Sequence, residues 1–176
     1  DHRDLHSFPT RRSSDLQARQ LAKKKGLTMF SSLEELGDKR FDVITLWHVL
    51  EHVPDLMECV KRLGVLLKPG GILVIAVPNH KSWDAKKYKE YWAAYDVPRH
   101  LWHFDRNAMK DLLPKTFQQI KTKPMWFDAF YVCLLSEKYR TGKQNWIKGA
   151  INGLCSNLFA CYTKEYSSIV YYYQKR

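Results

Sequence analysis

The sequence predicts an α/β fold built on a largely parallel sheet. Two apolar runs, FDVITL at 41–46 and ILVIAV at 72–77, are rich in β-branched residues and indicate strands that are covered on both faces. Between them, over 56–67, leucine and valine recur at helical spacing and form one apolar stripe. A strand, a helix and a second apolar strand in this order are typical of a parallel, doubly wound sheet.

Composition fits one globular domain of 176 residues, of which 45% are hydrophobic. The formal net charge of +11 favours an anionic partner such as nucleic acid, a membrane surface or a phosphorylated substrate, although a lysine-rich solvated surface explains it equally well. The four cysteines stand singly, so the sequence predicts neither a zinc site nor a disulfide framework, and this usage suits a cytoplasmic protein.

The first sixteen residues do not read as part of the fold. HSFPTRRSSDL at 6–16 resembles a sequencing-library adapter translated in one frame. We therefore expect 1–16 to be a non-native segment and 17–176 to be a partial domain, with natural sequence missing upstream of Gln17.

The N-terminal part of the remaining chain predicts three short elements. QARQLAKKK at 17–25 reads as the end of a basic helix that Gly26 closes. LTMF at 27–30 reads as a short strand, and SSLEEL at 31–36 as a turn or helix that one of its serines caps.

The central and C-terminal parts carry clearer boundary signals. Asp55 and Glu58 form an N-cap pair for the helix after Pro54, and LKPGG at 67–71 predicts a turn. The aromatic stretch 79–104 predicts an irregular functional loop or lid. The last third predicts a helix over 106–113 capped by Asp105, a strand over 117–123, a helical insert over 129–163 that breaks at Thr141-Gly142, and a closing strand over 167–174.

FDVITLWHVLEHVPD followed by LLKPGGILVIAVPN resembles the class I S-adenosylmethionine (SAM)-dependent methyltransferases. LEHVPD in particular is similar to the ubiquinone-biosynthesis O-methyltransferases and their relatives. The resemblance covers 17–176 and implies a Rossmann-like methyltransferase fold with SAM as the cofactor.

The family's sheet has the strand order 3-2-1-4-5-7-6. The resemblance implies that 27–30 is strand 3, 41–46 strand 4, 72–77 strand 5, 117–123 strand 6 and 167–174 strand 7. Strand 1 with its glycine-rich loop and strand 2 have no counterpart, so we expect them before Gln17. The chain as given is therefore expected to be inactive and poorly folded alone, with an unpaired edge on strand 4.

The cofactor contacts implied by the resemblance come from two places. Ser32 and Leu33, after strand 3, would hold the adenine, where Ser32 replaces an acid common in the family; a helix cap is the alternative role. Leu46, Trp47 and His48, at the end of strand 4, would lie beside the sulfonium, with Trp47 offering π surface to the positive sulfur. A tryptophan that only fills the core is the alternative.

His48, Glu51 and His52 stand at helical spacing and would share a face. Relatives in quinone synthesis carry a carboxylate in the His48 position, where a divalent metal has been proposed to orient substrate hydroxyls. The two imidazoles and one carboxylate of this chain could hold a transition metal better than magnesium. The alternative, which we favour, is that Glu51 and His52 are structural loop residues, so no metal ligand is assigned.

Transfer to a hydroxyl needs a base that removes its proton, and histidine suits neutral pH. The candidates are His52, His100 and His103, and we favour His100 because DVPRHLWHF at 96–104 lies where the family builds its acceptor site. Arg99 could bind an anionic group of the acceptor. Both residues could instead tie the lid to the sheet.

The aromatic content of 83–104 suggests a flat or apolar acceptor, although aromatic rings also pack lids without touching a ligand. The resemblance implies O-methylation of a small-molecule or lipid-like acceptor. The insert 129–163 mixes large apolar residues with lysines and could rest on a membrane surface, although an ordinary amphipathic cover is the favoured reading. Two other functions stay open. A nucleic-acid methyltransferase is favoured by the positive charge, but strand 4 does not end in the Asn/Asp-Pro-Pro-aromatic motif of the methylases that act on amino groups. The other is an inactive SAM-fold protein that serves as a binding module.

Overall fold

The structure is a computed structural model that describes residues 20–26, 28, 30 and 32–176. The chain divides into two units, 1–39 and 40–176, and each is described by itself. Residues 1–19, which hold the suspected adapter segment, lie outside the described residues.

The described part of the N-terminal unit is helical over 20–24, and Gly26 follows with a positive φ of 73°, as predicted for a helix end. The strand predicted at 27–30 is not found at Thr28 and Phe30, and its other two residues lie outside the description. A 3-10 helix, η1 (Glu34–Leu36), follows, but the predicted serine cap is wrong: Leu33 occupies the N-cap position and no side chain caps the turn.

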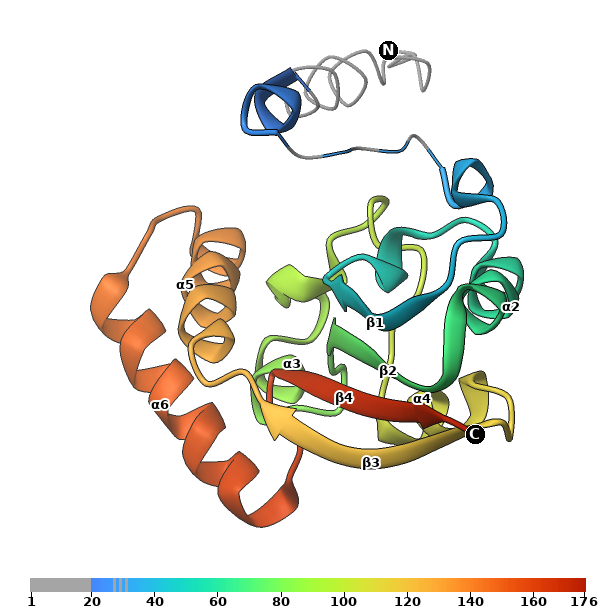
Figure 1. The fold of residues 1–176 in the computed structure, drawn as a ribbon. Helices are drawn as coiled ribbons and strands as arrows, with labels where there is room; N and C mark the ends of the chain where they lie inside the picture. The colour runs from blue at the N-terminus through green and yellow to red at the C-terminus, as the bar shows by residue number, and fades with distance from the viewer. Residues whose placement is uncertain (1–19, 27, 29, 31) are drawn as a thin grey trace. The chain divides into compact units, whose positions relative to one another are not determined.

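The second unit is built on four strands in the order β1-β2-β4-β3 (Figure 1). The strands are β1 (Phe41–Trp47), β2 (Leu67–Pro78), β3 (Phe117–Pro124) and β4 (Ser168–Lys175). β1 and β2 are parallel, whereas β4 is antiparallel to both β2 and β3. This order is the 4-5-7-6 portion of the expected family order, so the predicted fold class is confirmed for this part of the sheet.

Helix α2 (Leu56–Leu66) connects the two parallel strands. Asp55 caps it by accepting a hydrogen bond from the Glu58 amide at 3.0 Å, as predicted. Its apolar stripe is buried against β2 and β4, together with Met109 of α4 (Arg106–Leu112). The predicted turn at 67–71 is instead the start of β2, where the pairing with β1 shifts register and Gly70 has a φ of 77°.

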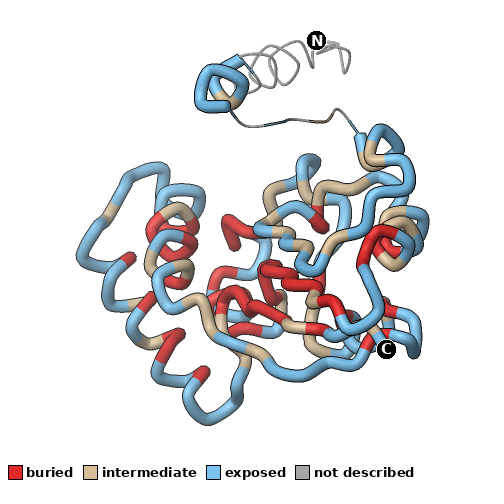
Figure 2. Tube along the Cα trace, in the orientation of Figure 1, coloured by how far each residue is buried: buried red, intermediate tan, exposed pale blue. Residues whose placement is uncertain are grey.

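Burial differs between the two parallel strands. Residues 73–78 of β2 are all buried, as predicted for a strand covered on both faces, and Figure 2 shows buried residues concentrated along the central strands. The expectation that both faces of β1 are covered is wrong, because Val43 and Trp47 are half-exposed while Ile44 and Leu46 pack on the core. Within the described residues β1 pairs with β2 alone.

The stretch 79–104 is more regular than an open lid. It contains α3 (Trp83–Tyr88) and two 3-10 helices, η3 (Lys89–Tyr91) and η4 (Ala93–Tyr95). Tyr88 and Trp92 are buried in a second hydrophobic cluster, which this stretch forms with Val132 and Cys133 of α5, so the two rings are structural and do not face an acceptor.

The insert forms two helices, α5 (Asp128–Thr141) and α6 (Trp146–Thr163), that break at Gly142 as predicted. Helix α5 packs on both α6 and the 79–104 segment, and α6 lies on the outside (Figure 1). The favoured reading as an ordinary amphipathic cover is wrong for α6, because Leu154, Leu158 and Phe159 are each more than half exposed.

Candidate active site

A cavity of about 430 Å³ lies where the parallel strands end. His48 directly follows β1, Pro78 ends β2, and α5 closes the opposite wall with Tyr131 and Tyr139. Carboxyl ends of parallel strands are the usual place for ligands in open α/β sheets. The ionisable lining includes His48, Glu51, Asp96, Arg99, His100 and Asp128.

His48 is held between two carboxylates. Its backbone turns sharply after β1 with a φ of 51°, and its amide donates to the Ala76 carbonyl at 3.0 Å. Nε2 lies 3.0 Å from Asp128 Oδ2, and Nδ1 lies 3.2 Å from Glu51 Oε1. Hydrogen bonding to Asp128 and then to Glu51 raises the pKa of His48 to about 9, so the ring is an imidazolium at neutral pH.

We expect this raised pKa to make stability depend on pH. A group whose pKa rises from 6.5 to about 9 on folding stabilises the fold fully below pH 6.5, and that contribution is lost as the pH rises through 9. Thermal unfolding of the unaltered protein and of His48→Gln should therefore differ most near pH 6 and converge above pH 9. A difference that grows with pH would contradict the assignment.

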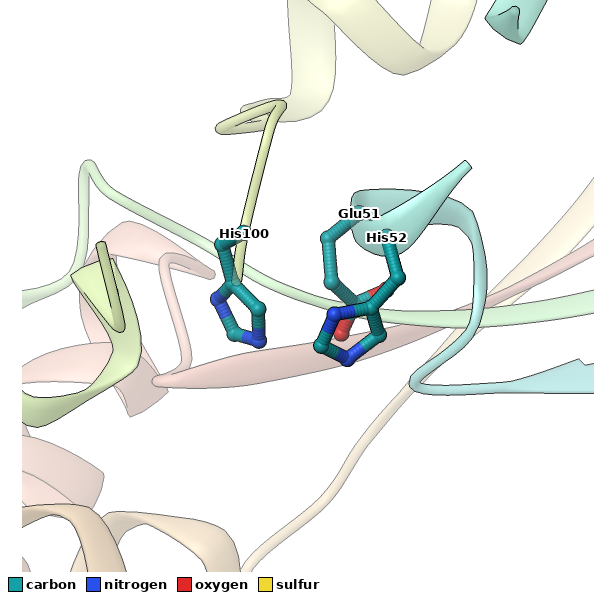
Figure 3. Close-up of side chains that lie close together, drawn as sticks. All are labelled: Glu51, His52 and His100. Atoms are coloured by element: carbon teal, nitrogen blue, oxygen red, sulfur yellow. The ribbon is translucent and has the colours of Figure 1, made fainter. Parts of the chain in front are cut away.

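Glu51, His52 and His100 come together beside the cavity (Figure 3). The first two belong to η2 (Leu50–His52), and His100 reaches them from the facing segment, with the His52 and His100 ring centres 4.6 Å apart. One ligand atom from each residue lies within 4.8 Å of the other two.

Backbone carbonyls select the tautomer of both rings. His100 Nδ1 lies 2.7 Å from the Ala94 carbonyl, and His52 Nδ1 lies 2.9 Å from the Arg99 carbonyl. A carbonyl can only accept, so each Nδ1 carries the proton and each Nε2 of the neutral ring keeps its lone pair. Burial lowers the pKa of His100, which favours the neutral ring.

This arrangement can do two things chemically. A neutral Nε2 can accept a proton from a hydroxyl. Two Nε2 lone pairs with Glu51 Oε2, a buried oxygen without a hydrogen-bond partner among the described residues, could alternatively ligate a divalent metal. The ligand set considered from sequence was His48, Glu51 and His52, but the structure turns His48 Nε2 to Asp128 and supplies His100 in its place.

Arg99 lines the cavity but is held by Asp96, to which its guanidinium donates from both Nε and Nη2. The segment that carries it is tied down mainly by other groups: the Leu101 amide donates to the Glu51 carbonyl at 2.8 Å, and Trp102 Nε1 donates to the Val53 carbonyl at 2.7 Å. The backbone of this segment and the Trp102 side chain, rather than the Arg99 side chain, thus attach it to η2 and the residue after it.

Comparison with known proteins places the chain in a family. Residues 6–116, more than half of the chain, match the family described as "Methyltransferase domain". The chain belongs to this methyltransferase-domain family. Membership of this family agrees with the strand order of the sheet and with a cavity at the carboxyl ends of its parallel strands.

Individual relatives match shorter stretches. The ubiquinone biosynthesis O-methyltransferase of Coxiella burnetii is 40% identical over 57 residues, which are 32% of this chain and 24% of that protein. Its counterpart in Rhodopseudomonas palustris is 31% identical over 89 residues, 48% of this chain and 35% of that protein. The matched part of this chain thus spans between a quarter and about a third of the length of these curated relatives.

The fold also matches solved structures. A SAM-dependent methyltransferase from Thermotoga maritima, described as a possible histamine N-methyltransferase, superposes with a TM-score of 0.60 at 18% identity, covering 91% of this chain and 70% of that chain. The likeness shows that the chain has the Rossmann-like fold of class I methyltransferases.

The residues predicted to bind SAM fall in both units of this methyltransferase-domain protein. Ser32 and Leu33 belong to the N-terminal unit, and Leu46, Trp47 and His48 end β1 in the second. Trp47 is 52% exposed, so the alternative of a tryptophan that only fills the core is wrong. Leu46 packs on the core, and His48 lines the cavity.

Sequence reasoning missed the two acids that organise the cavity. Asp128 is the first residue of α5 and lies 80 residues from His48 in the sequence. An acid in the first turn of a helix is common because it stabilises the helix dipole, so the sequence offers no sign of its contact with His48. Asp96 holds Arg99 from three residues away, a spacing that could have indicated the pair.

Proposed function

We propose that this protein transfers a methyl group from SAM to a hydroxyl of a small-molecule or lipid-like acceptor bound in the cavity. The observation that carries the proposal is His100: its Nδ1 proton is committed to the Ala94 carbonyl, and Nε2 is the basic atom of the neutral ring at a cavity beside the ends of β1 and β2. The O-methyltransferase relatives support the same substrate class.

SAM, when bound, supplies an electrophilic methyl group on a positive sulfur. The residues of this chain would do the rest. His100 Nε2 accepts the proton of the acceptor hydroxyl as its oxygen bonds to the methyl carbon, and the electron pair of the broken S–C bond stays on sulfur. The walls of the cavity would orient the acceptor hydroxyl beside His100, and such positioning supplies a large part of the rate.

A nucleic-acid acceptor fits this cavity less well. Glu51, Asp96 and Asp128 place carboxyl groups on its walls, and Arg99 is already paired with Asp96. A phosphate backbone needs cations that are free to neutralise it. The net charge of +11 must therefore serve another surface or solubility.

A second candidate is metal-assisted methyl transfer, favoured by the unpartnered Glu51 Oε2 beside His52 and His100. A divalent metal there would bind and acidify the acceptor hydroxyl. Because His100 Nε2 would then be a ligand, the base and the ligand roles exclude each other.

The proposal is tested on the product of the complete reading frame. SAM consumption is measured with phenolic and aliphatic hydroxyl acceptors and with RNA, before and after chelation. Turnover with a hydroxyl acceptor that survives chelation supports the base mechanism, and its loss supports the metal. Turnover with RNA alone would overturn the substrate class, and SAM binding without any turnover would indicate a binding module.

We expect Trp47→Ala to weaken S-adenosylmethionine binding in the same protein by roughly 2- to 30-fold, the range for losing a cation–π contact. Calorimetry measures the affinity. Trp146→Ala, which removes an exposed indole from α6, is the matched control and should leave it unchanged. Equal affinities of the unaltered protein and a folded Trp47→Ala would remove Trp47 from the cofactor site.

A further inference from the structure

The outward face of α6 is an apolar stripe. Ile147, Ile151, Leu154, Leu158 and Tyr162 recur at intervals of three and four residues and so share one face of the helix. Their exposed fractions run from 53% for Leu154 to 91% for Tyr162. We call these five residues the α6 stripe.

The opposite face of α6 carries small residues and fits closely on α5. A Cβ atom added at Gly149 would come within 2.9 Å of the Leu134 Cα, and one added at Gly153 within 2.7 Å of the Phe130 Cα. Ser156 and Ala160 continue this face and are buried. Only this side of the helix can approach α5 so closely, so the packing fixes the rotation that turns the large aliphatic residues outward.

Helix α6 therefore turns its large apolar residues outward, and the described part of the protein covers only its other side. A surface helix normally places polar residues on its outer face, and a helix without them is normally covered. Exposed apolar patches of this kind mark interaction sites. Among the described residues no helix has the length and apolarity needed to cross a bilayer.

Charge and aromatic residues indicate what covers the stripe. The helix contains no acid and a single cation, Lys148, while Lys143 precedes it and Lys164 follows it. Trp146 and Tyr162 are exposed at its two ends. Aliphatic residues can enter the acyl chains of a lipid layer, aromatic residues favour its interface, and lysines pair with anionic headgroups. The helix carries all three kinds in the order that such a surface requires.

We propose that α6 docks the protein on an anionic lipid surface, with the α6 stripe in the acyl boundary and Lys143, Lys148 and Lys164 among the headgroups. A second copy of the chain fits less well, because a self-association through this face would bring like-charged lysines together. The proposal does not depend on methyl transfer, since it uses no residue of the cavity.

Flotation of the complete reading-frame product with vesicles tests the docking, because bound protein rises with the lipid while aggregates sink. We expect flotation with vesicles of phosphatidylcholine and phosphatidylglycerol, less with phosphatidylcholine alone, and a decrease as salt rises. Brominated lipid should quench tryptophan fluorescence, and Trp146→Phe should remove most of that quenching.

The double variant Ile151→Asn/Leu158→Asn should reduce vesicle partitioning by roughly tenfold or more, the factor expected for losing the burial of one aliphatic side chain or more. Met57→Asn is the matched control, because Met57 is 65% exposed on α2 and should leave partitioning unchanged. Circular dichroism checks that each variant is folded. Equal flotation of the double variant and the control would overturn the proposal. So would a protein that ignores vesicles but forms a dimer that the double variant dissociates.

Discussion

Replacing His100 with Gln is expected to lower turnover by roughly 10²–10⁴-fold, the usual range for losing a general base. The affinity for S-adenosylmethionine should stay unchanged. Gln is of similar size and has no basic nitrogen, so it removes the proton acceptor that Nε2 provides in the neutral His100 ring. Rate measurements at saturating cofactor and calorimetry separate the two effects.

His103→Gln is the matched control for this experiment. His103 lies three residues further along the same segment and also bonds a backbone carbonyl, that of Tyr95 at 3.0 Å, but it is not part of the cavity wall. Turnover should change little. If His100→Gln weakened cofactor binding and turnover equally, His100 would be a structural residue and the base would have to be sought elsewhere.

The sequence predicts most of the second unit because its signals are local. Apolar runs define β1 and β2, Asp55 and Asp105 cap their helices as expected, and Gly142 ends α5. The errors have physical causes. KPGG reads as a turn, yet its backbone continues in β2, because β2 takes up its extra residues as a register shift against β1 between Leu67 and Ile72.

The site is predicted less completely because its contacts are long-range. The sequence singles out the end of β1 and the 96–104 segment, and the structure brings His48, Arg99 and His100 to one cavity. Neither the tautomer of His100 nor the partner of His48 can be read from spacing, since Ala94 acts through its carbonyl and Asp128 is 80 residues away.

Asp84 shows the same limit in the stretch that the sequence presents as a lid. Its fully buried carboxyl group accepts three hydrogen bonds: from Trp92 Nε1 at 2.7 Å, from Ser156 Oγ at 2.6 Å and from Ser167 Oγ at 2.8 Å. These donors come from the end of η3, from α6 and from the residue before β4. The network joins three separate segments, so the stretch 79–104 is anchored to the sheet and to the outer helix.

We expect Asp84→Ala to lower the free energy of unfolding by roughly 3 kcal/mol or more, because each buried donor that loses its acceptor costs about 1–3 kcal/mol. For a protein of this size that corresponds to a fall of roughly 6–12 °C in the unfolding midpoint. Calorimetry of the complete reading-frame product measures both quantities. Asp111→Ala, at an exposed position of α4, is the control and should change stability by no more than about 0.5 kcal/mol. Similar losses in the two variants would mean that the Asp84 network does not hold the segment in place, and that burial of Tyr88 and Trp92 alone anchors it.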